Sequence, residues 1–299
     1  MRILLQFPEG LKSKAITYQR ELEKKGHTVF VSSSPCYGAC DIAIDEARAV
    51  KADKIVHVGH SKFVHGKLPL KVEYEEYPLE INLALVGSSL APLKKFRKIA
   101  LATTVQHIPQ LSALKDMLVK SGWKIITGKG SKSQHDGQVL GCDFSGMSSA
   151  EKEADCVLYI GGGLFHPLGF EATKPVFALN PFTGELRQLN DELTREKKRE
   201  TGALIKASEA KTFGIIVSTK PGQLSLSSAE DAKKRLEKKG KTASILISNE
   251  INFDALANFN LFEAYINTAC PRLRGDYERF GKPVVNIDKL SVLLELLKK

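Results

Sequence analysis

The chain of 299 residues has no long apolar run and little aromatic content. No stretch of it approaches the ~20 consecutive apolar residues that a membrane-spanning helix requires. The amino terminus reaches Pro8 and Glu9 too early for the apolar core of a secretory signal peptide. We therefore expect a cytoplasmic protein with no membrane partner.

Cysteine is scarce, and its number, five, is odd. In a reducing compartment such a set does not build a disulfide framework. The thiols are then either buried in the core or ligands of a metal or cluster.

Positive charge is in excess, with a formal net charge of +10, whereas aromatic residues make up only 7% of the chain. Runs of basic residues at 94–98, 195–199 and 233–239 are each typical of a solvated helix face. A functional interpretation is attraction to an anionic partner, nucleic acid or an acidic protein. With so few aromatic residues to stack on bases, the charge alone does not indicate nucleic acid. We expect no direct nucleic-acid partner.

One α/β pattern occurs three times along the chain. In each pass an apolar strand precedes a helix, the helix ends near a lysine and a glycine, and a β-branched strand follows. The passes are strand 2–7, helix 18–25 and strand 27–32; strand 99–103, helix 111–120 and strand 123–127; and strand 213–218, helix 229–238 and strand 243–248.

Further strands are expected at 54–58, 156–160, 176–179, 262–266 and 284–287. Alternating strands and helices predict parallel sheets, and the repetition predicts triplication. We expect an α/β fold of three similar domains with small parallel sheets, in a pseudo-threefold triangular arrangement. The predicted domains are 1–90, 91–190 and 191–299, and a long charged connecting helix over about 182–211 spans the boundary between the last two.

Three of the cysteines follow predicted strands directly. Cys40 and Cys142 come after the second strand of their units, and Cys270 comes after the third strand of its unit. In open α/β sheets ligands are held beyond the carboxyl ends of the strands. Three cysteines, one per domain, would leave one iron of a 4Fe–4S cluster open to bind a small molecule. Pro271 follows Cys270, and a Cys-Pro pair is frequent among cluster ligands.

The other two cysteines fit less well. Cys36 and Cys40 have the spacing that opens the common radical S-adenosylmethionine signature, but Ala43 stands where its third cysteine belongs. A zinc pair of Cys36 and Cys40 stays open, although no second pair follows at finger spacing. Cys156 begins an apolar strand, which predicts a buried, inert thiol.

Several other loop residues are candidates for a substrate pocket. Gln6 follows the first strand and could bind polar ligand groups. Gly161, Gly162 and Gly163 end a strand and would let a ligand approach the backbone closely, with His166 just beyond. Their spacing is not that of a dinucleotide-binding fingerprint.

Three histidines, His57, His60 and His65, lie close together in the sequence. No carboxylate or cysteine neighbours them to complete a metal site, so we expect these strand-end side chains to act as hydrogen-bonding groups. A metal site there is the less favoured alternative.

Taken together, these loops resemble the signature segments of the first-step diphthamide synthase family. The segments are Gln-Phe-Pro-Glu-Gly-Leu at 6–11, Tyr-Gly-Ala-Cys-Asp at 37–41, Leu-Gly-Cys at 140–142, Tyr-Ile-Gly-Gly-Gly-Leu-Phe-His at 159–166 and Ala-Cys-Pro-Arg-Leu at 269–273. The resemblance covers essentially the whole chain in the right order. The chain is most similar in length to the archaeal form, which works as a homodimer. One departure is Leu164, where the family more usually has arginine.

The resemblance implies an atypical radical S-adenosylmethionine enzyme. Cys40, Cys142 and Cys270 would hold one 4Fe–4S cluster, and S-adenosylmethionine would bind at its open iron. An electron donor would reduce the cluster, the Cγ–S bond on the methionine side would break, and the 3-amino-3-carboxypropyl radical would add to C2 of a histidine imidazole in translation elongation factor 2. Cys36 is not a ligand in this mapping. The predicted S-adenosylmethionine pocket comprises Gln6, Gly161, Gly162, Gly163 and His166.

Two alternatives stay open at this point. A quinolinate-synthase-like enzyme also has three α/β domains with one cluster cysteine each, but its cluster acts as a Lewis acid. A basic RNA- or ribosome-binding protein would carry the cysteines incidentally.

Overall fold

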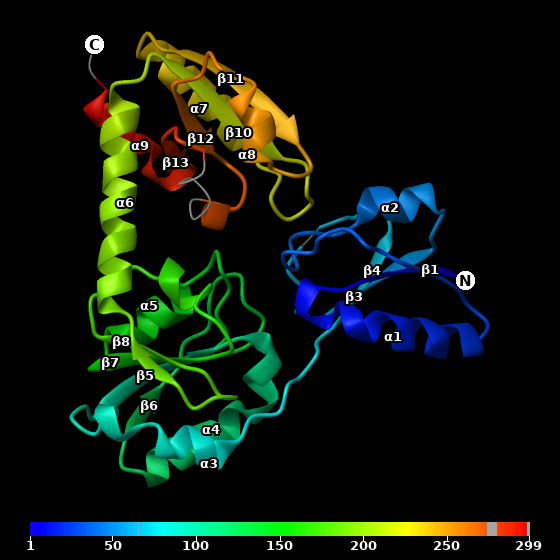
Figure 1. The fold of residues 1–299 in the computed structure, drawn as a ribbon, viewed down its shortest axis with the longest axis vertical. Helices are drawn as coiled ribbons and strands as arrows, with labels where there is room; N and C mark the ends of the chain where they lie inside the picture. Colours follow the sequence, from blue (N-terminus) through cyan, green and yellow to red (C-terminus); the bar gives the residue numbers. More distant parts are fainter. Residues whose placement is uncertain (65, 274–279, 298–299) are drawn as a thin grey trace. The chain divides into compact units, whose positions relative to one another are not determined.

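Three separate sheets make up the framework of the computed structural model, which describes residues 1–297 except 65 and 274–279 (Figure 1). The chain divides into two compact units. The first, Met1–Leu193, contains two sheets, and the second, Thr194–Lys299, contains the third.

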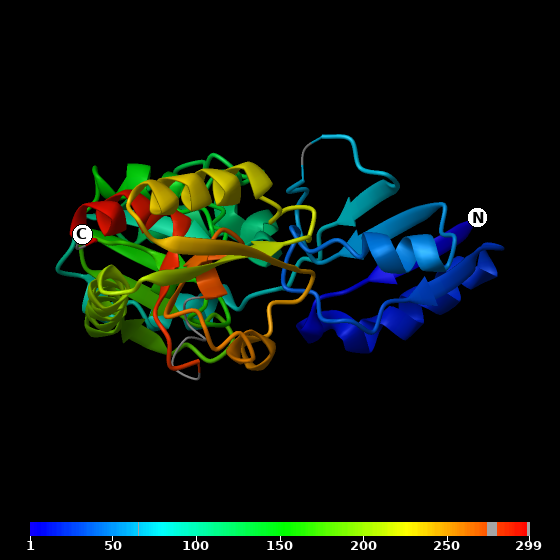
Figure 2. The same ribbon diagram turned by 90° about the horizontal axis from the view of Figure 1, so that it is seen from above.

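The first sheet is built from the amino-terminal quarter of the chain. Its strands, all parallel, lie in the order β2-β1-β3-β4. Ile3 and Leu5 pack on the face covered by α1, whereas Leu4 packs with α2 on the other, so the two helices lie on opposite faces (Figure 2). The elements are β1 (Arg2–Gln6), α1 (Lys12–Lys24), β2 (Thr28–Val31), α2 (Ile44–Ala49), β3 (Lys54–Val58) and β4 (Lys71–Glu75).

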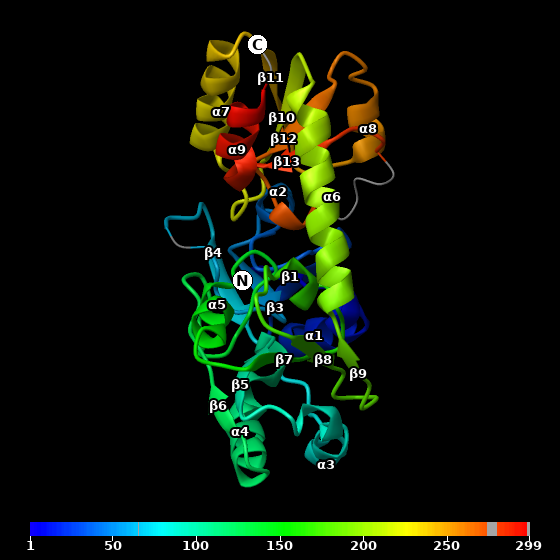
Figure 3. The ribbon, with the colours of Figure 1, turned by 90° about the vertical axis from the view of Figure 1, so that its left-hand side faces the viewer.

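The second sheet has five strands in the order β6-β5-β7-β8-β9, of which only the β8–β9 pair is antiparallel. Helices α3 and α4 cover one face and α5 the other (Figure 3). The elements are α3 (Leu83–Ser88), β5 (Lys98–Thr103), α4 (Leu111–Lys120), β6 (Lys124–Ile126), α5 (Ser145–Glu151), β7 (Cys156–Ile160), β8 (Val176–Leu179) and β9 (Leu186–Gln188).

The third sheet again is parallel, in the order β11-β10-β12-β13. Helices α7 and α9 pack on one face and α8 on the other (Figure 3). The elements are α6 (Asn190–Ser208), β10 (Thr212–Ser218), α7 (Leu226–Lys238), β11 (Thr242–Ser248), α8 (Phe253–Ala257), β12 (Ala264–Asn267), β13 (Val284–Asn286) and α9 (Leu290–Leu296). Short 3-10 helices are Glu9–Leu11, Ala91–Leu93, Val105–Gln110, Pro167–Gly169 and Ile287–Lys289.

The strand order is the same in all three sheets: the first strand lies between the second and the third, with the fourth outside the third. This confirms the predicted α/β fold with three small parallel sheets. The predicted helix caps are also confirmed, because Gly26, Gly122 and Gly240 have φ angles of 82°, 100° and 73°. The domain boundaries and the triangular arrangement stay predictions.

Two strands were not expected from the sequence. β4 alternates charged residues along its length and is partly exposed, and β9 has only three residues. Neither carries the buried apolar run that marks an inner strand.

Over the described residues, no helix combines the length and the apolar character needed to cross a bilayer.

Candidate functional site

The three predicted cluster cysteines lie in strand-end loops, as expected. Cys40 lies between β2 and α2, Cys142 between β6 and α5, and Cys270 directly after β12. All three are partly exposed, whereas Cys36 and Cys156 are buried. Partial exposure at the carboxyl edge of a parallel sheet is the position in which a side chain can reach a ligand.

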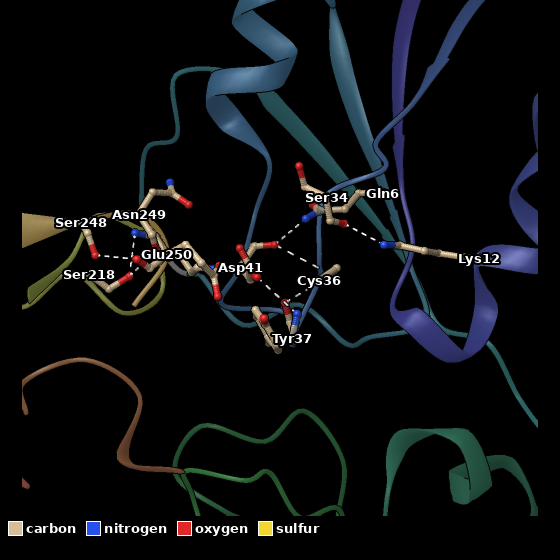
Figure 4. A network of polar contacts seen from close by, with 12 residues as sticks. Gln6, Lys12, Ser34, Cys36, Tyr37, Asp41, Ser218, Ser248, Asn249 and Glu250 are labelled. Atoms are coloured by element: carbon tan, nitrogen blue, oxygen red, sulfur yellow. Dashed lines mark hydrogen bonds and ion pairs between the residues drawn. The ribbon is translucent and has the colours of Figure 1, made fainter. Parts of the chain in front are cut away.

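Cys40 lies near the tip of a tight turn. The Asp41 N–H donates to the Gly38 carbonyl across the turn (3.0 Å), and the Tyr37 N–H donates to Asp41 Oδ2 (3.2 Å). From the end of β1, Gln6 Nε2 donates to the Asp41 carbonyl (2.7 Å) and Gln6 Oε1 accepts from the Ala43 N–H (3.1 Å). Figure 4 shows Gln6, Tyr37 and Asp41 converging on this segment. The loop is therefore held on both sides of its thiol.

Cys142 occupies a turn of the same kind. The Asp143 N–H donates to the Leu140 carbonyl (3.4 Å), and the Leu140 N–H donates back to the Asp143 carbonyl (3.3 Å). The Asp143 carboxylate accepts from the backbone N–H groups of Lys132 (2.6 Å) and Ser145 (3.1 Å). Burial acts to raise the pKa of Asp143, but a hydrogen bond from the Ser145 hydroxyl (2.6 Å) and these two backbone hydrogen bonds favour the charged carboxylate, so the pKa is lowered.

Cys270 is held by two buried asparagines. Asn267 Nδ2 donates to the Cys270 carbonyl and to Asn286 Oδ1, both at 2.8 Å. Asn267 Oδ1 accepts from the Ala269 N–H (3.0 Å), and Asn286 Nδ2 donates to the Pro271 carbonyl (3.0 Å). Backbone groups on both sides of the thiol are thus fixed by side chains of β12 and β13.

The three cysteine loops share one design, a partly exposed thiol whose neighbouring backbone is tied down by buried amides or carboxylates. Thiolates are the ligands that iron–sulfur clusters use, and fixed loops lower the conformational entropy lost when a cluster binds. The residues present therefore fit a 4Fe–4S cluster. That these three thiols bind one and the same cluster stays a prediction.

The structure describes all five residues that are predicted to line the S-adenosylmethionine pocket. A Cβ on Gly161 would collide with the Tyr159 hydroxyl, whereas one on Gly163 would meet open space. His166 stacks beside Tyr159, with ring centroids 6.2 Å apart. Leu164 packs against the core of the second sheet, which accounts for an apolar residue there. Gly162 lies in the loop after β7 and is exposed to solvent.

Gln6 is placed differently from the rest of that pocket. It is 2% exposed, and its amide binds the Cys40 loop and His57. Its polar atoms thus support a ligand loop from within the fold.

His57 and His60 lie beside Gln6. His57 Nδ1 is 3.0 Å from Gln6 Oε1, and His57 Nε2 is 2.9 Å from His60 Nδ1. Burial lowers the pKa of His57 to about 3, with a further contribution from His60, and lowers the pKa of His60 to about 4. Both rings are therefore neutral at physiological pH. The two side chains act as hydrogen-bonding groups, as the sequence predicted. The third histidine, His65, lies outside the described residues.

Cys156 is confirmed as a buried residue. It begins β7 with no exposed surface, and burial raises the pKa of its thiol to about 12. A thiol in this environment does not react or bind metal at neutral pH.

Asp41, Asp143 and Asn267 were missed as functional residues. A Cys-Asp pair occurs at both 40–41 and 142–143, and this repeat was a signal that the sequence offered. Asn267 ends an otherwise apolar buried strand, where an unmatched amide is costly. Each residue acts on the backbone beside a cysteine rather than on a ligand.

A cavity of about 370 Å³ lies in the second unit between α6 and residues 281–289. None of the predicted site residues lines it. Its charged residues include two ion pairs, Arg199 with Glu196 (2.7 Å) and Lys289 with Glu200 (3.9 Å). Lys206 and Lys282 also line the cavity, and we assign it no function.

Comparison with protein families matches residues 7–299 to the model of the diphthamide synthesis proteins. The chain is 38% identical to the 2-(3-amino-3-carboxypropyl)histidine synthase of Pyrococcus horikoshii, over 99% of this chain and 86% of that protein. It is 29% identical to subunit 1 of the corresponding enzyme of Caenorhabditis elegans, over 98% of this chain and 76% of that one.

Two solved structures have the same fold over nearly the whole chain. Dph2 from Pyrococcus horikoshii superposes with a TM-score of 0.87 at 36% identity, covering 100% of this chain and 87% of that one. A second crystal structure of Dph2 from that organism, with a 4Fe–4S cluster, gives a TM-score of 0.86 at 36% identity, covering 99% and 86% of the two chains.

Proposed function

The chain belongs to the family of diphthamide synthesis proteins and is a 2-(3-amino-3-carboxypropyl)histidine synthase, and we propose that Cys40, Cys142 and Cys270 hold the 4Fe–4S cluster at which it works. The family match over residues 7–299 favours this function over the quinolinate-synthase-like and RNA-binding alternatives.

The observation that carries the ligand assignment is the contrast among the five thiols. The three in strand-end loops are partly exposed and lie on loops fixed by hydrogen bonds. Cys156 is a strand residue with a raised pKa, and Cys36 is buried beside two histidines. Three ligands leave one iron for S-adenosylmethionine, which is the substrate.

When bound, the reduced cluster supplies the electron that breaks a carbon–sulfur bond of S-adenosylmethionine. The chain's own residues act by positioning. Gln6, Asp143 and Asn267 fix the backbone beside the three thiols, so these loops would hold the cluster without reorganising during the reaction.

We propose further that the loop after β7 borders the bound S-adenosylmethionine. Gly162 and Gly163 are exposed, and a glycine loop lets a ligand approach backbone N–H groups closely. His166 is partly exposed in the same loop, and its ring stacks beside Tyr159. Gln6 contributes through the Cys40 loop instead of through direct contact, because its amide is engaged there.

The protein substrate we propose is translation elongation factor 2, modified at a histidine in the cytoplasm. A net charge of +10 supports electrostatic attraction to an acidic protein surface. We also propose that the chain works as a homodimer, as the resemblance to the archaeal form implies, and that an external one-electron donor reduces the cluster.

The function is tested with anaerobically reconstituted protein. Mixed with dithionite and S-adenosylmethionine, it is expected to release methylthioadenosine, and adding elongation factor 2 should transfer the aminocarboxypropyl group to a histidine, seen by mass spectrometry. A reduced, cluster-loaded protein that releases 5′-deoxyadenosine instead would overturn the assigned bond cleavage. Synthesis of quinolinate would restore the alternative.

A further inference from the structure

A second group of metal-binding side chains lies beside the Cys40 loop. Cys36 Sγ and one ring nitrogen each of His57 and His60 lie within 4.8 Å of one another. Cys36 is 3% exposed and His57 is fully buried. The sequence alone offered no cysteine to complete a site with these histidines; the fold supplies Cys36 from the loop after β2.

The hydrogen bonds around His57 fix which of its nitrogens is free to bind. The Ala43 N–H can only donate and the Asp41 carbonyl can only accept, so their contacts set the orientation of the Gln6 amide. Gln6 Oε1 then faces His57 Nδ1 at 3.0 Å, and that nitrogen must carry the proton. His57 Nε2 is left with its lone pair directed at His60.

This arrangement is typical of a metal-binding histidine. Such a residue usually donates its second ring N–H to a carbonyl or carboxylate, which orients the ring and strengthens the metal bond. Gln6 is that partner for His57. The donor set of one thiol and two neutral imidazoles favours zinc over the harder magnesium and calcium ions, which prefer oxygen.

We propose that Cys36, His57 and His60 bind a single divalent cation of the zinc type, with a water molecule in the fourth position. Zn–S and Zn–N bonds of ~2.3 and ~2.05 Å with tetrahedral angles place the ligand atoms ~3.3–3.6 Å apart. The two nitrogens, now 2.9 Å apart, must separate by ~0.4 Å. The Cys36 sulfur lies within 4.8 Å of one nitrogen of each ring, so from that limit it must approach by ~1.3 Å.

Proton balance accompanies binding. The Cys36 thiol releases one proton to solvent and binds as the thiolate. His60 donates from Nδ1 in the metal-free protein, so it transfers that proton to Nε2 with no net change. His60 is partly exposed, so water can reach its ring for the second step. His57 keeps its N–H on Gln6 throughout.

The site would brace the loop that carries the predicted cluster ligand Cys40. Cys36 belongs to that loop, whereas His57 belongs to β3. A metal between them cross-links loop and sheet, in addition to the Gln6 hydrogen bonds. The site uses none of the three predicted cluster ligands, so the inference stands apart from the proposed function.

The test is metal analysis of the full-length protein with its cluster in place. The protein is dialysed anaerobically against ZnCl₂, then against metal-free buffer, and zinc and iron per chain are measured by mass spectrometry. Wild type and the Cys156→Ala control are expected to keep one zinc. Cys36→Ala and His60→Ala are expected to keep none, with iron unchanged in all four proteins.

A second measurement guards against misfolding of the variants. Added zinc should raise the melting temperature of wild type and of Cys156→Ala but not that of Cys36→Ala. Absence of zinc from wild type, or equal zinc in Cys36→Ala, overturns the proposal. So does zinc that is lost only with Cys40→Ala, because the metal would then occupy the cluster position. Iron content and methylthioadenosine release report on the proposed function separately.

Discussion

Replacing Asn267 by alanine is expected to loosen the Cys270 loop without disturbing the sheet that supports it. The Asn267 side chain is 1% exposed and takes part in three hydrogen bonds, to the Cys270 carbonyl, the Ala269 N–H and the Asn286 amide. Alanine keeps the β12 backbone and removes all three.

The size of the effect follows from those contacts. A hydrogen bond contributes about 1 kcal/mol net, so the three together contribute about 3 kcal/mol. The free energy of unfolding of the second unit should fall by about that amount. The larger consequence is local, because the backbone on both sides of the Cys270 thiol loses its fixed position and the cluster should be retained poorly.

A matched control lies in the same unit. Asn252 caps α8, and its Oδ1 accepts from the Asp254 and Ala255 N–H groups, so Asn252→Ala should cost about 1 kcal/mol. Among the described residues, the hydrogen bonds of its side chain lie within α8 and not in a cysteine loop. Urea unfolding measures the stability of both variants, and iron analysis after anaerobic gel filtration measures cluster retention.

The reasoning predicts that Asn267→Ala is destabilised and loses iron, whereas Asn252→Ala is destabilised less and keeps it. If Asn267→Ala retained full iron with an unchanged reduction potential, the loop would not depend on this side chain. Loss of iron from Asn252→Ala to the same degree would show that general destabilisation alone accounts for the effect.

Three further predictions concern other features. In cluster-free protein at pH 8, Cys156 should resist iodoacetamide while the strand-end cysteines react, because a pKa of about 12 leaves only ~1 in 10,000 of its thiols ionised; fast labelling of Cys156 would contradict the assigned burial. Gly161→Ala should displace Tyr159, and Gly163→Ala should put a methyl group where the ligand approaches, so both should weaken S-adenosylmethionine binding in calorimetry; normal binding by both variants would separate the loop from the pocket. Association with elongation factor 2, followed by stopped flow, should slow as salt is added, and a salt-independent rate would rule out steering.

The fold was accessible from the sequence because its inner strands are short apolar runs with turn signals on both sides. β3, β7, β8 and α4 begin and end at the predicted residues. β4 and β9 were not predicted because edge strands bury little apolar surface and carry polar residues. Helix α1 starts at Lys12, earlier than predicted. Its start was hard to predict because no N-cap side chain marks it.

The cysteines of the candidate site could be predicted from the sequence, but the side chains that hold their loops could not. Strand-end position singled out three thiols. The contacts of Gln6 with Asp41, Ala43 and His57 depend on strand register, in which Gln6 pairs with His57. The approach of Cys36 to the histidines depends on the path of a loop. Sequence spacing carries no information on either.

The most direct test of the account is the iron content of five single cysteine-to-alanine variants, reconstituted anaerobically in parallel. Cys40→Ala, Cys142→Ala and Cys270→Ala should each lose the cluster and release no methylthioadenosine, whereas Cys36→Ala and Cys156→Ala should keep four irons per chain. Full iron in Cys270→Ala would contradict the assignment of the ligands, and so would loss of the cluster from Cys36→Ala.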